Sequence, residues 1–461
     1  MNKTKQKSVS EFFKKDCPAY GAYDNIRKIP SAIDGLKVSQ RKLLWTGFKK
    51  ARKDFVKTET FANLTALETA YIHGSTSLCT VCDSLVQQFV GAANYAFFTG
   101  NTGGWGCRLI PMSSAPRYTR LKLNDLAESV FNELDNDILE KQYFEGQWIE
   151  PKYFVPIFPV IFLNSSDGVS TGFSSKIYSR NPKEIIEYIK RKLAGTVSPK
   201  LELLPWFRGF KGTVKINPET KIVEAFGKIE KINSTSYRIT ELPIGMDYQK
   251  YLDHLNKFVE TGKIVDYEDK CDPKKDTILF EIKTTRAFTN TREEKRDLEN
   301  ELKLVRTLPE NLNCIDENNR VKEYSSVHEI LDDFIALRLK YYGKRREWLL
   351  KILKDELLKL KSKFIWCSAI ISKKIVISNR PKSEIVEKLE RDFSKDIIKV
   401  DGDYSYLLNM SMTSITKEKM EELKQTLIGK GEEYKAVAAS TPESLWLEDL
   451  KTFSSILKKL D

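Results

Sequence analysis

Residues 38–53 read VSQRKLLWTGFKKARK, and this stretch decides the fold of the first third of the chain. Leu44 and Phe48 stand four positions apart, which places them on one face of a helix. Most other positions are polar or basic, and the cations are Arg41, Lys42, Lys49, Lys50, Arg52 and Lys53. The stretch is therefore predicted to be a basic amphipathic helix.

Two more helices and a strand are predicted downstream of this stretch. The helices cover residues 60–70 and 75–89, the second with apolar side chains spaced by four, three and four positions. A short apolar strand over residues 95–98 leads into a glycine-rich turn, residues 100–106. Three helices followed by a β wing are typical of a winged-helix domain, and a basic example indicates binding to DNA. We assign this domain to residues 1–147.

The positive charge is concentrated at the N-terminal end. Residues 1–60 hold 15 basic and 6 acidic side chains, so they carry +9 of the chain's net charge of +12. A concentrated basic face attracts a polyanion, either nucleic acid or anionic lipid head groups. The alternative is a solvated, lysine-rich surface without a partner.

The composition excludes several classes of protein. With 461 residues, 41% hydrophobic and 30% charged, the chain is neither low-complexity nor disordered. No apolar run reaches the roughly 18 residues needed to span a bilayer, and the Lys-rich start lacks the apolar centre of a secretory signal. We therefore expect a multidomain intracellular protein without a membrane partner.

The seven cysteines do not suggest a disulfide framework in a chain of this length. Cys79 and Cys82 form a lone C-x-x-C inside a predicted helix, without a second Cys or His pair at zinc spacing. Core thiols are therefore favoured over a metal or redox site. Candidate acidic metal ligands are limited to the isolated pairs Asp135-x-Asp137 and Asp401-x-Asp403, and no G-x-x-x-x-G-K-[S/T] loop is present. Phosphate chemistry that needs a divalent ion would take its main ligands from elsewhere, so we expect no metal site in this chain.

The middle of the chain has a different sequence pattern from the first part. Residues 148–310 hold short β-rich runs broken by Gly and Pro, over 153–163, 212–216 and 237–242, with a helix near 182–193. This pattern predicts a separate α+β domain.

The last part of the chain is predicted to be long-helical. From Val327, apolar residues are spaced by three, four, three and four positions, the heptad signature of a helix packed along another helix. A second helical stretch covers residues 416–434. We expect an antiparallel coiled coil, residues 311–365 and 413–461, with a small helical head, residues 366–412. An ordinary helical bundle is the alternative.

One local constellation carries chemistry: the pair Arg117-Tyr118. A phenol with a pKa near 10 is a poor nucleophile at neutral pH, but an adjacent guanidinium stabilises both a phenolate and the charge on a phosphate under attack. Attack by a tyrosine on a DNA phosphodiester conserves the bond energy as a phosphotyrosyl ester, so the strand can be resealed. In a chain with 19 Tyr, the dipeptide alone would more often be an ordinary surface pair.

The motifs taken together resemble the DNA-gate, or cleavage–religation, part of type II DNA topoisomerases, nearly end to end. The similar segments are Ile29-Pro30-Ser31, Asp34-Gly35-Leu36-Lys37, Gln40-Arg41-Lys42, Tyr71-Ile72-His73-Gly74, Ala115-Pro116-Arg117-Tyr118, Ile239-Thr240-Glu241-Leu242-Pro243 and Leu445-Trp446. The resemblance implies a multidomain α+β fold with a winged-helix domain (1–147), a β-rich tower domain (148–310), the coiled coil, and a C-gate dimerisation head (366–412).

The family's roles carry over by position. The resemblance implies that Tyr118 is the nucleophile forming a 5′-phosphotyrosyl bond, that Arg117 binds the scissile phosphate, and that His73 hydrogen-bonds the phosphate oxygens. Val169 stands where the family usually has an isoleucine that wedges between base pairs and bends the DNA. The DNA-binding cations would be Arg41, Lys42, Lys37, Lys49 and Lys50.

Two positions depart from the family pattern. Ile72 replaces the first His of the Y-H-H-G segment, which leaves His73 to act there. Ala115-Pro116 stands where the family usually has Ala-Ala, and proline restricts the backbone just ahead of the pair Arg117-Tyr118.

The resemblance also implies partners. The family's E-G-D-S-A and D-x-D-x-D motifs are absent, and the sequence begins with its own methionine, so we expect a split enzyme. A separate subunit would supply the ATPase and the metal-binding (TOPRIM) module that hold ATP and Mg²⁺. This chain would form a homodimer on double-stranded DNA, within a heterotetramer or larger assembly.

The expected function is the DNA cleavage–religation subunit of an ATP-dependent type II topoisomerase, an isomerase. Eukaryotic-like motifs on a split chain suggest a phage or virus. The location would be the cytoplasm of a bacterial host for a phage, and otherwise the nucleus or a viral replication site. The alternative function is a non-catalytic DNA-clamping protein that keeps the winged helix and coiled coil.

Overall fold

The computed structural model describes residues 7–196, 202–290, 295–378, 380–411 and 415–461. It consists of two compact units, one formed by residues 1–338 with 447–461 and the other by residues 339–446. The predicted four-part division, with boundaries after residues 147, 310, 365 and 412, stays a prediction.

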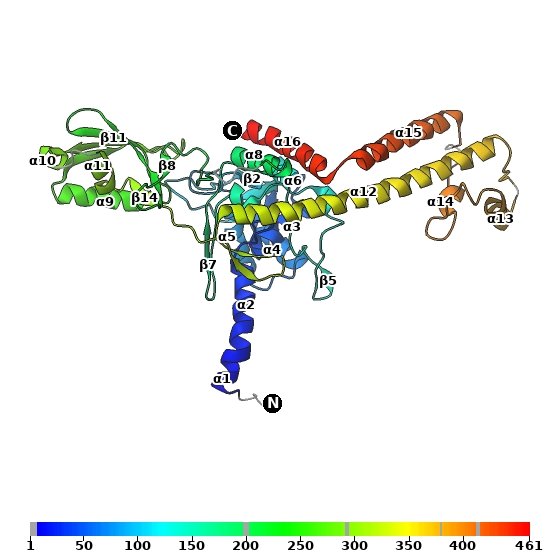
Figure 1. Cartoon of the computed structure of the whole chain (residues 1–461), viewed down its shortest axis with the longest axis horizontal. Helices are drawn as coiled ribbons and strands as arrows, with labels where there is room; N and C mark the ends of the chain where they lie inside the picture. Colours follow the sequence, from blue (N-terminus) through cyan, green and yellow to red (C-terminus); the bar gives the residue numbers. More distant parts are fainter. Residues whose placement is uncertain (1–6, 197–201, 291–294, 379, 412–414) are drawn as a thin grey trace. The chain divides into compact units, whose positions relative to one another are not determined.

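The first unit begins with helices. Three of them follow one another along a single line (Figure 1): α1 (Val9–Glu11), the π-helix η1 (Phe12–Asp16) and α2 (Cys17–Lys28). The three helices predicted from the sequence are confirmed: α3 (Val38–Lys50), α4 (Thr58–Glu68) and α5 (Ser75–Val86). Helix α3 ends three residues earlier than predicted, and the following Arg52 forms ion pairs with Glu128 and Glu133.

A three-stranded antiparallel sheet follows these helices. Its strands are β1 (Val56–Lys57), β2 (Phe98–Thr102) and β3 (Arg120–Leu123), in the order β1-β3-β2. The predicted strand over residues 95–98 is wrong, because β2 begins only at Phe98. The side chain of Asn164 occupies both backbone groups of Tyr95: its Oδ1 accepts from the Tyr95 N–H at 2.9 Å, and its Nδ2 donates to the Tyr95 carbonyl at 2.8 Å.

The pair Cys79 and Cys82 lies on the buried face of α5, where the two residues are 7% and 1% exposed. Burial raises the pKa of both thiols above the ordinary value, which leaves them protonated and inert. These are the surroundings that core thiols require. Among the described residues, no three His, Cys, Asp or Glu side chains are grouped so that they could hold a metal ion.

Short elements connect the first sheet to the middle of the chain: α6 (Asp125–Val130), η2 (Glu133–Asp135), β4 (Tyr143–Phe144), β5 (Gln147–Trp148), α7 (Val160–Leu163), β6 (Ser166–Val169), β7 (Ser174–Ile177) and α8 (Pro182–Leu193). The helix predicted near 182–193 is confirmed as α8. The β-rich run predicted over 153–163 is wrong, because it holds no strand and ends in α7. All four residues of α7 are buried, and a short apolar run of this kind does not distinguish a strand from a buried helical turn.

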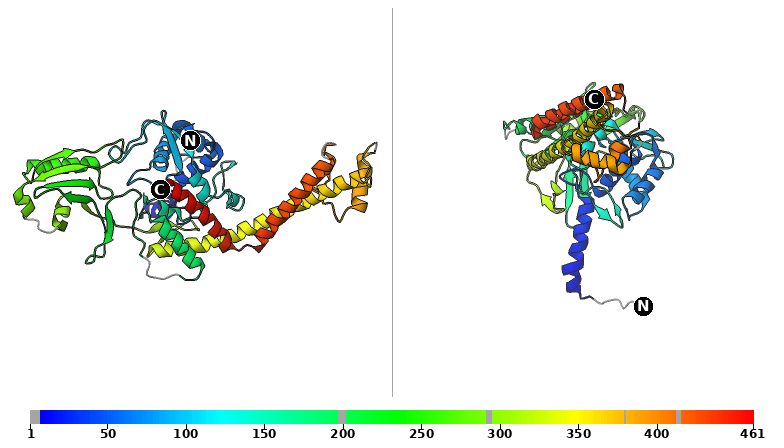
Figure 2. Two further views of the ribbon diagram at one scale, coloured as in Figure 1. Left: turned by 90° about the horizontal axis from the view of Figure 1, so that it is seen from above. Right: turned by 90° about the vertical axis from the view of Figure 1, so that its right-hand side faces the viewer.

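The middle of the chain contains two further sheets (Figure 2). The larger has the antiparallel order β10-β11-β13-β12, with β10 (Lys228–Lys231), β11 (Ser236–Glu241), β13 (Phe280–Thr284) and β12 (Ile264–Asp269). The smaller has the order β14-β9-β8, with β14 (Val305–Thr307), β9 (Val223–Phe226) and β8 (Thr213–Ile216). The remaining elements are α9 (Tyr248–Glu260), α10 (Arg286–Asn290), α11 (Lys295–Glu301) and the hairpin β15 (Asn313–Ile315) with β16 (Val321–Glu323).

The second unit is helical. The long helix α12 (Val327–Ile371) begins in the first unit and continues into the second, where α15 (Lys417–Ala439) runs antiparallel to it. The pairs that fix this direction are Arg346 with the Ala438 carbonyl at 2.7 Å and Lys430 with Glu356 at 3.1 Å. Helix α16 (Pro442–Leu460) returns the chain to the first unit.

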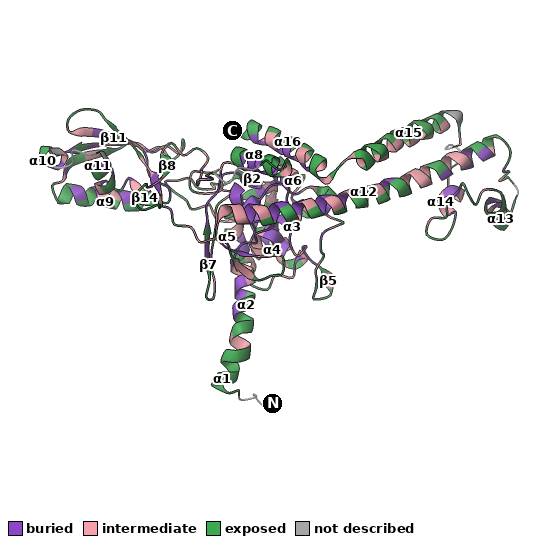
Figure 3. Ribbon diagram, viewed as in Figure 1, coloured by how far each residue is buried: buried purple, intermediate pink, exposed green. Residues whose placement is uncertain are grey.

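A compact head joins the ends of α12 and α15. It contains α13 (Lys382–Asp392) and α14 (Ser405–Leu408), and the colouring in Figure 3 marks its buried residues. Its core is built from Trp366, Cys367, Ala369, Ile375, Ile385, Leu389, Ile397, Tyr404 and Leu407. No described helix is both long and apolar enough to cross a membrane.

Candidate functional site

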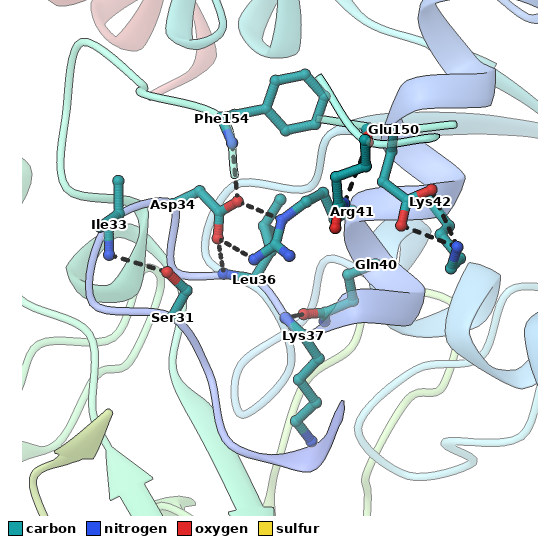
Figure 4. A network of polar contacts seen from close by, with 11 residues as sticks. Ser31, Ile33, Asp34, Leu36, Lys37, Gln40, Arg41, Lys42, Glu150 and Phe154 are labelled. Atoms are coloured by element: carbon teal, nitrogen blue, oxygen red, sulfur yellow. Dashed lines mark hydrogen bonds and ion pairs between the residues drawn. The ribbon is translucent and has the colours of Figure 1, made fainter. Parts of the chain in front are cut away.

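Asp34 is the centre of a buried polar network at the start of α3 (Figure 4). Its carboxylate accepts from Arg41 Nε at 2.6 Å and Nη2 at 3.1 Å, and from the backbone N–H groups of Leu36 and Phe154. Burial alone would lower the pKa of the Arg41 guanidinium, but Asp34 raises it above the ordinary value. The guanidinium therefore stays charged, and the network joins α3 to the loop before it and to Phe154, 120 positions from Asp34.

Gly35 makes this turn possible. Its φ is +67°, and a Cβ there would lie 2.3 Å from the backbone nitrogen of Ile161. Only glycine combines the left-handed conformation with so close an approach. The glycine of the Asp34-Gly35 pair in the motif is therefore required by the backbone conformation and by the close contact with Ile161.

Lys42 forms a second buried pair beside the first (Figure 4). Its Nζ lies 2.8 Å from Glu150 Oε1 and donates to the Thr69 carbonyl at 2.7 Å. Arg41 and Lys42 are 7% and 8% exposed, so the structure presents neither as a free surface cation. The DNA contact expected of these two residues stays a prediction, and what the structure shows for them is an ion pair.

The other expected DNA-binding cations are more accessible. Lys49 and Lys50 both face Glu68, at 3.6 and 3.3 Å, with side chains 38% and 44% exposed. The Lys49 ammonium also lies 4.4 Å from the centre of the Trp45 ring. Lys37 is 3.9 Å from the exposed Asp167 carboxylate. Exposed pairs of this kind are weak and can be exchanged for phosphate contacts.

His73 lies in the loop between α4 and α5, where its Nε2 is 2.8 Å from the hydroxyl of Tyr23. Burial and the nearby positive charge of Arg27 both lower the pKa of the imidazole below its ordinary value. At neutral pH the ring is therefore uncharged and can act through a hydrogen bond. Tyr23 is a partner that sequence reasoning did not find.

Val169 stands at the end of β6, in the hairpin that β6 forms with β7, and it is 76% exposed. The preceding Gly168 rests on the end of α2, where a Cβ would lie 2.2 Å from the Lys28 carbonyl oxygen. Asp24 of α2 also accepts two bonds from Thr171 at 3.0 Å each. The hairpin is thus fixed to α2, and it presents an apolar side chain to solvent.

These groups meet at one cavity of about 500 Å³. The predicted site residues that line it are His73, Lys37, Arg41, Lys42 and Val169. Further cations at its wall are Arg27, Lys28 and Lys152. The lining therefore combines an exposed apolar side chain, that of Val169, with mostly basic residues and one carboxylate, that of Glu150, which pairs with Lys42.

Tyr118 and Arg117 do not line this cavity. They lie in the turn before β3, where the Tyr118 N–H donates to the Ala115 carbonyl at 2.9 Å. Tyr118 is 62% exposed, and the Arg117 guanidinium carbon lies 5.0 Å from the centre of its ring. The phenol is thus accessible to a large substrate, with a cation beside it.

Residues 103–118 form the loop that carries this pair, and its tip is anchored to the larger sheet of the middle region. Arg108 Nη2 lies 2.6 Å from Glu241 Oε1, and the pair is largely buried. Leu109 packs into the core cluster of that sheet. The anchoring role of Arg108 and Glu241 was not predicted, although Glu241 stands in the segment Ile239–Pro243 that the sequence analysis singled out.

Comparison with known proteins defines the class. The sequence matches the A-subunit family of DNA gyrase/topoisomerase IV over residues 27–451. The chain therefore belongs to the type II DNA topoisomerases, in the family of the DNA-gate subunit.

Individual relatives agree with this assignment. The chain is 34% identical over 471 residues to the mitochondrial DNA topoisomerase 2 of Dictyostelium discoideum, covering 99% of this chain and 36% of the relative. It is 34% identical over 490 residues to the DNA topoisomerase 2 of Plasmodium falciparum, covering 98% and 34%. The chain thus spans about a third of the length of these relatives.

A solved structure supports the fold. The crystal structure of the Plasmodium falciparum topoisomerase II DNA-binding, cleavage and re-ligation domain is similar with a TM-score of 0.88 at 33% identity. The similarity covers 99% of this chain and 65% of that one. The mixed helix-and-sheet architecture expected from the sequence is confirmed at this level.

Proposed function

We propose that this chain cleaves and religates duplex DNA through Tyr118, as the DNA-gate subunit of a type II topoisomerase. The observation that carries the proposal is the exposed Tyr118 phenol with the Arg117 guanidinium beside it, in a chain that belongs to this family. An exposed phenol can reach a phosphate in a duplex, and the guanidinium is the group that would stabilise the charge of the transition state.

The chemistry is a transesterification. The Tyr118 phenolic oxygen attacks a backbone phosphorus, a phosphorus–Oη bond forms, and the bond from phosphorus to the 3′ oxygen of the preceding nucleotide breaks. The phenolic proton leaves to solvent or a base, and the 3′ oxygen takes up a proton. Attack by the freed 3′ hydroxyl reverses each step, so religation needs no further energy source. The ester links Tyr118 to the 5′ end.

The DNA-binding surface is the basic cavity and the helices around it. We assign the winged-helix role to α3, α4, α5 and the β1-β3-β2 sheet, with Lys37, Lys49 and Lys50 as phosphate contacts. Val169 is assigned as the wedge that inserts between base pairs, because an exposed β-branched side chain on a fixed hairpin suits that role. His73 is assigned as a hydrogen-bonding group to the phosphate.

The described residues hold no group of three or more His, Cys, Asp or Glu side chains that could hold a metal ion. We propose that this chain contributes the nucleophile and the cations that surround the phosphate. We propose that a separate subunit with an ATPase and a metal-binding module supplies the Mg²⁺ ligands and binds ATP. The phage or viral origin, and the intracellular location that follows from it, belong to the same proposal.

Opening a duplex requires two staggered cuts, so two copies of Tyr118 must face opposite strands in a two-fold dimer. We assign the second dimer contact, the C-gate, to the head. Within it, Ile375 and Leu407 fill the head's own core, whereas Ile371 and Val376 are 43% and 46% exposed. The last two are the candidates for burial in the dimer.

The experiment is a cleavage assay with supercoiled plasmid, Mg²⁺ and the partner subunit, stopped with detergent. The proposal predicts protein-linked linear DNA from the wild-type chain and none from Tyr118→Phe, with plasmid binding retained. The chain without its partner should bind DNA but cleave it little. Wild-type protein that binds DNA and never links to it would instead support the non-catalytic clamp.

A further inference from the structure

Gln87 ends helix α5, at the base of the loop that carries Arg117 and Tyr118. Its backbone N–H closes the helix on the Asp83 carbonyl at 2.9 Å, and its side chain points to the loop. The side-chain Nε2 donates to the Trp105 carbonyl at 2.9 Å and to the Pro111 carbonyl at 2.8 Å. These two acceptors lie on the outgoing and returning arms of the loop, so one amide holds both arms together.

The clamp continues toward the nucleophile through short contacts. Ser113 Oγ lies 3.2 Å from the same Gln87 nitrogen. The next residue, Ser114, exchanges two bonds with Gly104: its N–H donates to the Gly104 carbonyl at 2.7 Å, and its Oγ accepts from the Gly104 N–H at 2.9 Å. Only three residues separate Ser114 from Tyr118, so there is little chain in which a displacement at the clamp can be absorbed.

The far end of this segment is fixed as well. The Glu59 N–H of α4 donates to the Pro116 carbonyl at 3.4 Å, and the Thr119 hydroxyl donates to that of Thr58 at 2.8 Å. Tyr118 thus lies between a contact to α4 and the Gln87 clamp at the end of α5. Without the clamp, the loop would still be held at its tip by Arg108 and at its far end by α4. The segment between these two points would be free to shift, which changes the direction of the phenol without unfolding the helices.

We propose that Gln87 is a positioning residue for Tyr118: its side-chain amide holds the two arms of loop 103–118 in register and thereby sets the rate of strand cleavage. The inference rests on the proposed function, because it takes Tyr118 as the nucleophile. Gln87 touches neither the phosphate nor the phenol. Its loss should therefore slow cleavage while leaving the affinity for DNA unchanged.

The test compares three variants of the full chain. Gln87→Met keeps the length of the side chain and removes the donors, Gln87→Lys keeps donors at similar reach, and Gln88→Met is the matched control. Gln88 is the exposed neighbour, and within the described part of the chain its amide contacts only the Asn94 carbonyl at 3.2 Å, outside the loop. The readouts are plasmid affinity, the single-turnover rate of protein-linked cleavage with the partner subunit, and hydrogen exchange of the amides in residues 104–118 without partner or DNA.

We expect Gln87→Met to slow cleavage about 10²-fold, the scale for a misplacement of roughly 1 Å in a catalytic group. Its affinity should stay within twofold, and the Ser114 and Tyr118 amides should exchange faster. Gln87→Lys should recover most of the rate, and Gln88→Met should match the wild type. The proposal is overturned if Gln87→Met cleaves at the wild-type rate, or if affinity falls in parallel with rate.

A Tyr118→Phe variant separates this inference from the proposed function. If Tyr118→Phe still links to DNA, the nucleophile is wrong, and Gln87 cannot position it. If Tyr118→Phe abolishes linkage and Gln87→Met has no effect on rate or exchange, the inference on Gln87 alone fails. A Gln87→Met protein that does not fold would also contradict it, because the residue would then be structural.

Discussion

Replacement of Arg41 by alanine discriminates between a structural and a DNA-binding role for this residue. The structure places Arg41 in a buried pair with Asp34, and truncation removes two charge-assisted hydrogen bonds, of 2.6 and 3.1 Å. Asp34 would keep only its backbone donors, the N–H groups of Leu36 and Phe154. Breaking a buried ion pair on one side costs about 3–5 kcal/mol of unfolding free energy. Because two donors remain, we expect Arg41→Ala to cost about 3 kcal/mol, the lower end of that range.

The assay is denaturant unfolding followed by circular dichroism, alongside DNA binding as a function of salt. The control is Lys50→Ala, whose side chain is 44% exposed and pairs with Glu68 at 3.3 Å. Lys50→Ala should change the unfolding free energy by less than about 1 kcal/mol and reduce the salt slope by about one phosphate contact. A double variant, Arg41→Met with Asp34→Asn, should recover much of the lost stability, because no charge is left unpaired. The reasoning is refuted if Arg41→Ala unfolds like the wild type while its salt slope falls.

Three further predictions concern the site and the head. Arg117→Ala should slow cleavage about 10²–10³-fold, the scale for losing one charge-stabilising group, and an unchanged single-turnover rate would remove its catalytic assignment. Arg27→Ala should raise the pKa of His73 toward its ordinary value, because burial would then be the one remaining cause that lowers it. If the pKa of the imidazole measured by NMR is the same in the variant as in the wild type, Arg27 is not a cause of the shift. Deleting residues 372–410 should weaken dimerisation in light scattering while DNA binding persists, and a deletion protein that remains fully dimeric at sub-micromolar concentration would exclude the head as the C-gate.

The helices were predictable from the sequence because their cause is local. The spacing of apolar residues in 38–53 and 75–89 is enough to define α3 and α5, and the proline that starts α8 marks its first residue. The strand that was misplaced has a distant cause. The backbone of Tyr95 is hydrogen-bonded to the side chain of Asn164, 69 positions away, and no local sequence pattern predicts that bond.

In the candidate site, too, the residues could be predicted from local motifs, whereas their contacts could not. The resemblance to the family led to Tyr118, Arg117 and His73 without any coordinates, because motif spacing identifies them. The surroundings of these residues depend on the fold. The burial of Lys42 against Glu150 joins positions 108 residues apart, so the local sequence does not show that this cation is buried. The clamp formed by Gln87 could not be predicted for the same reason, since the fold brings its partners together from positions 18 and 24 residues away.

The central claim is that the oxygen of Tyr118 becomes bonded to a 5′ phosphate of DNA. The direct measurement is to trap the cleaved complex with detergent, digest the DNA and the protein, and locate the remaining nucleotide on the peptides by mass spectrometry. We predict one modified peptide, the one that contains Arg117 and Tyr118, with the nucleotide on the tyrosine oxygen through its 5′ phosphate. A nucleotide found on any other residue, or attached through its 3′ end, would contradict the account.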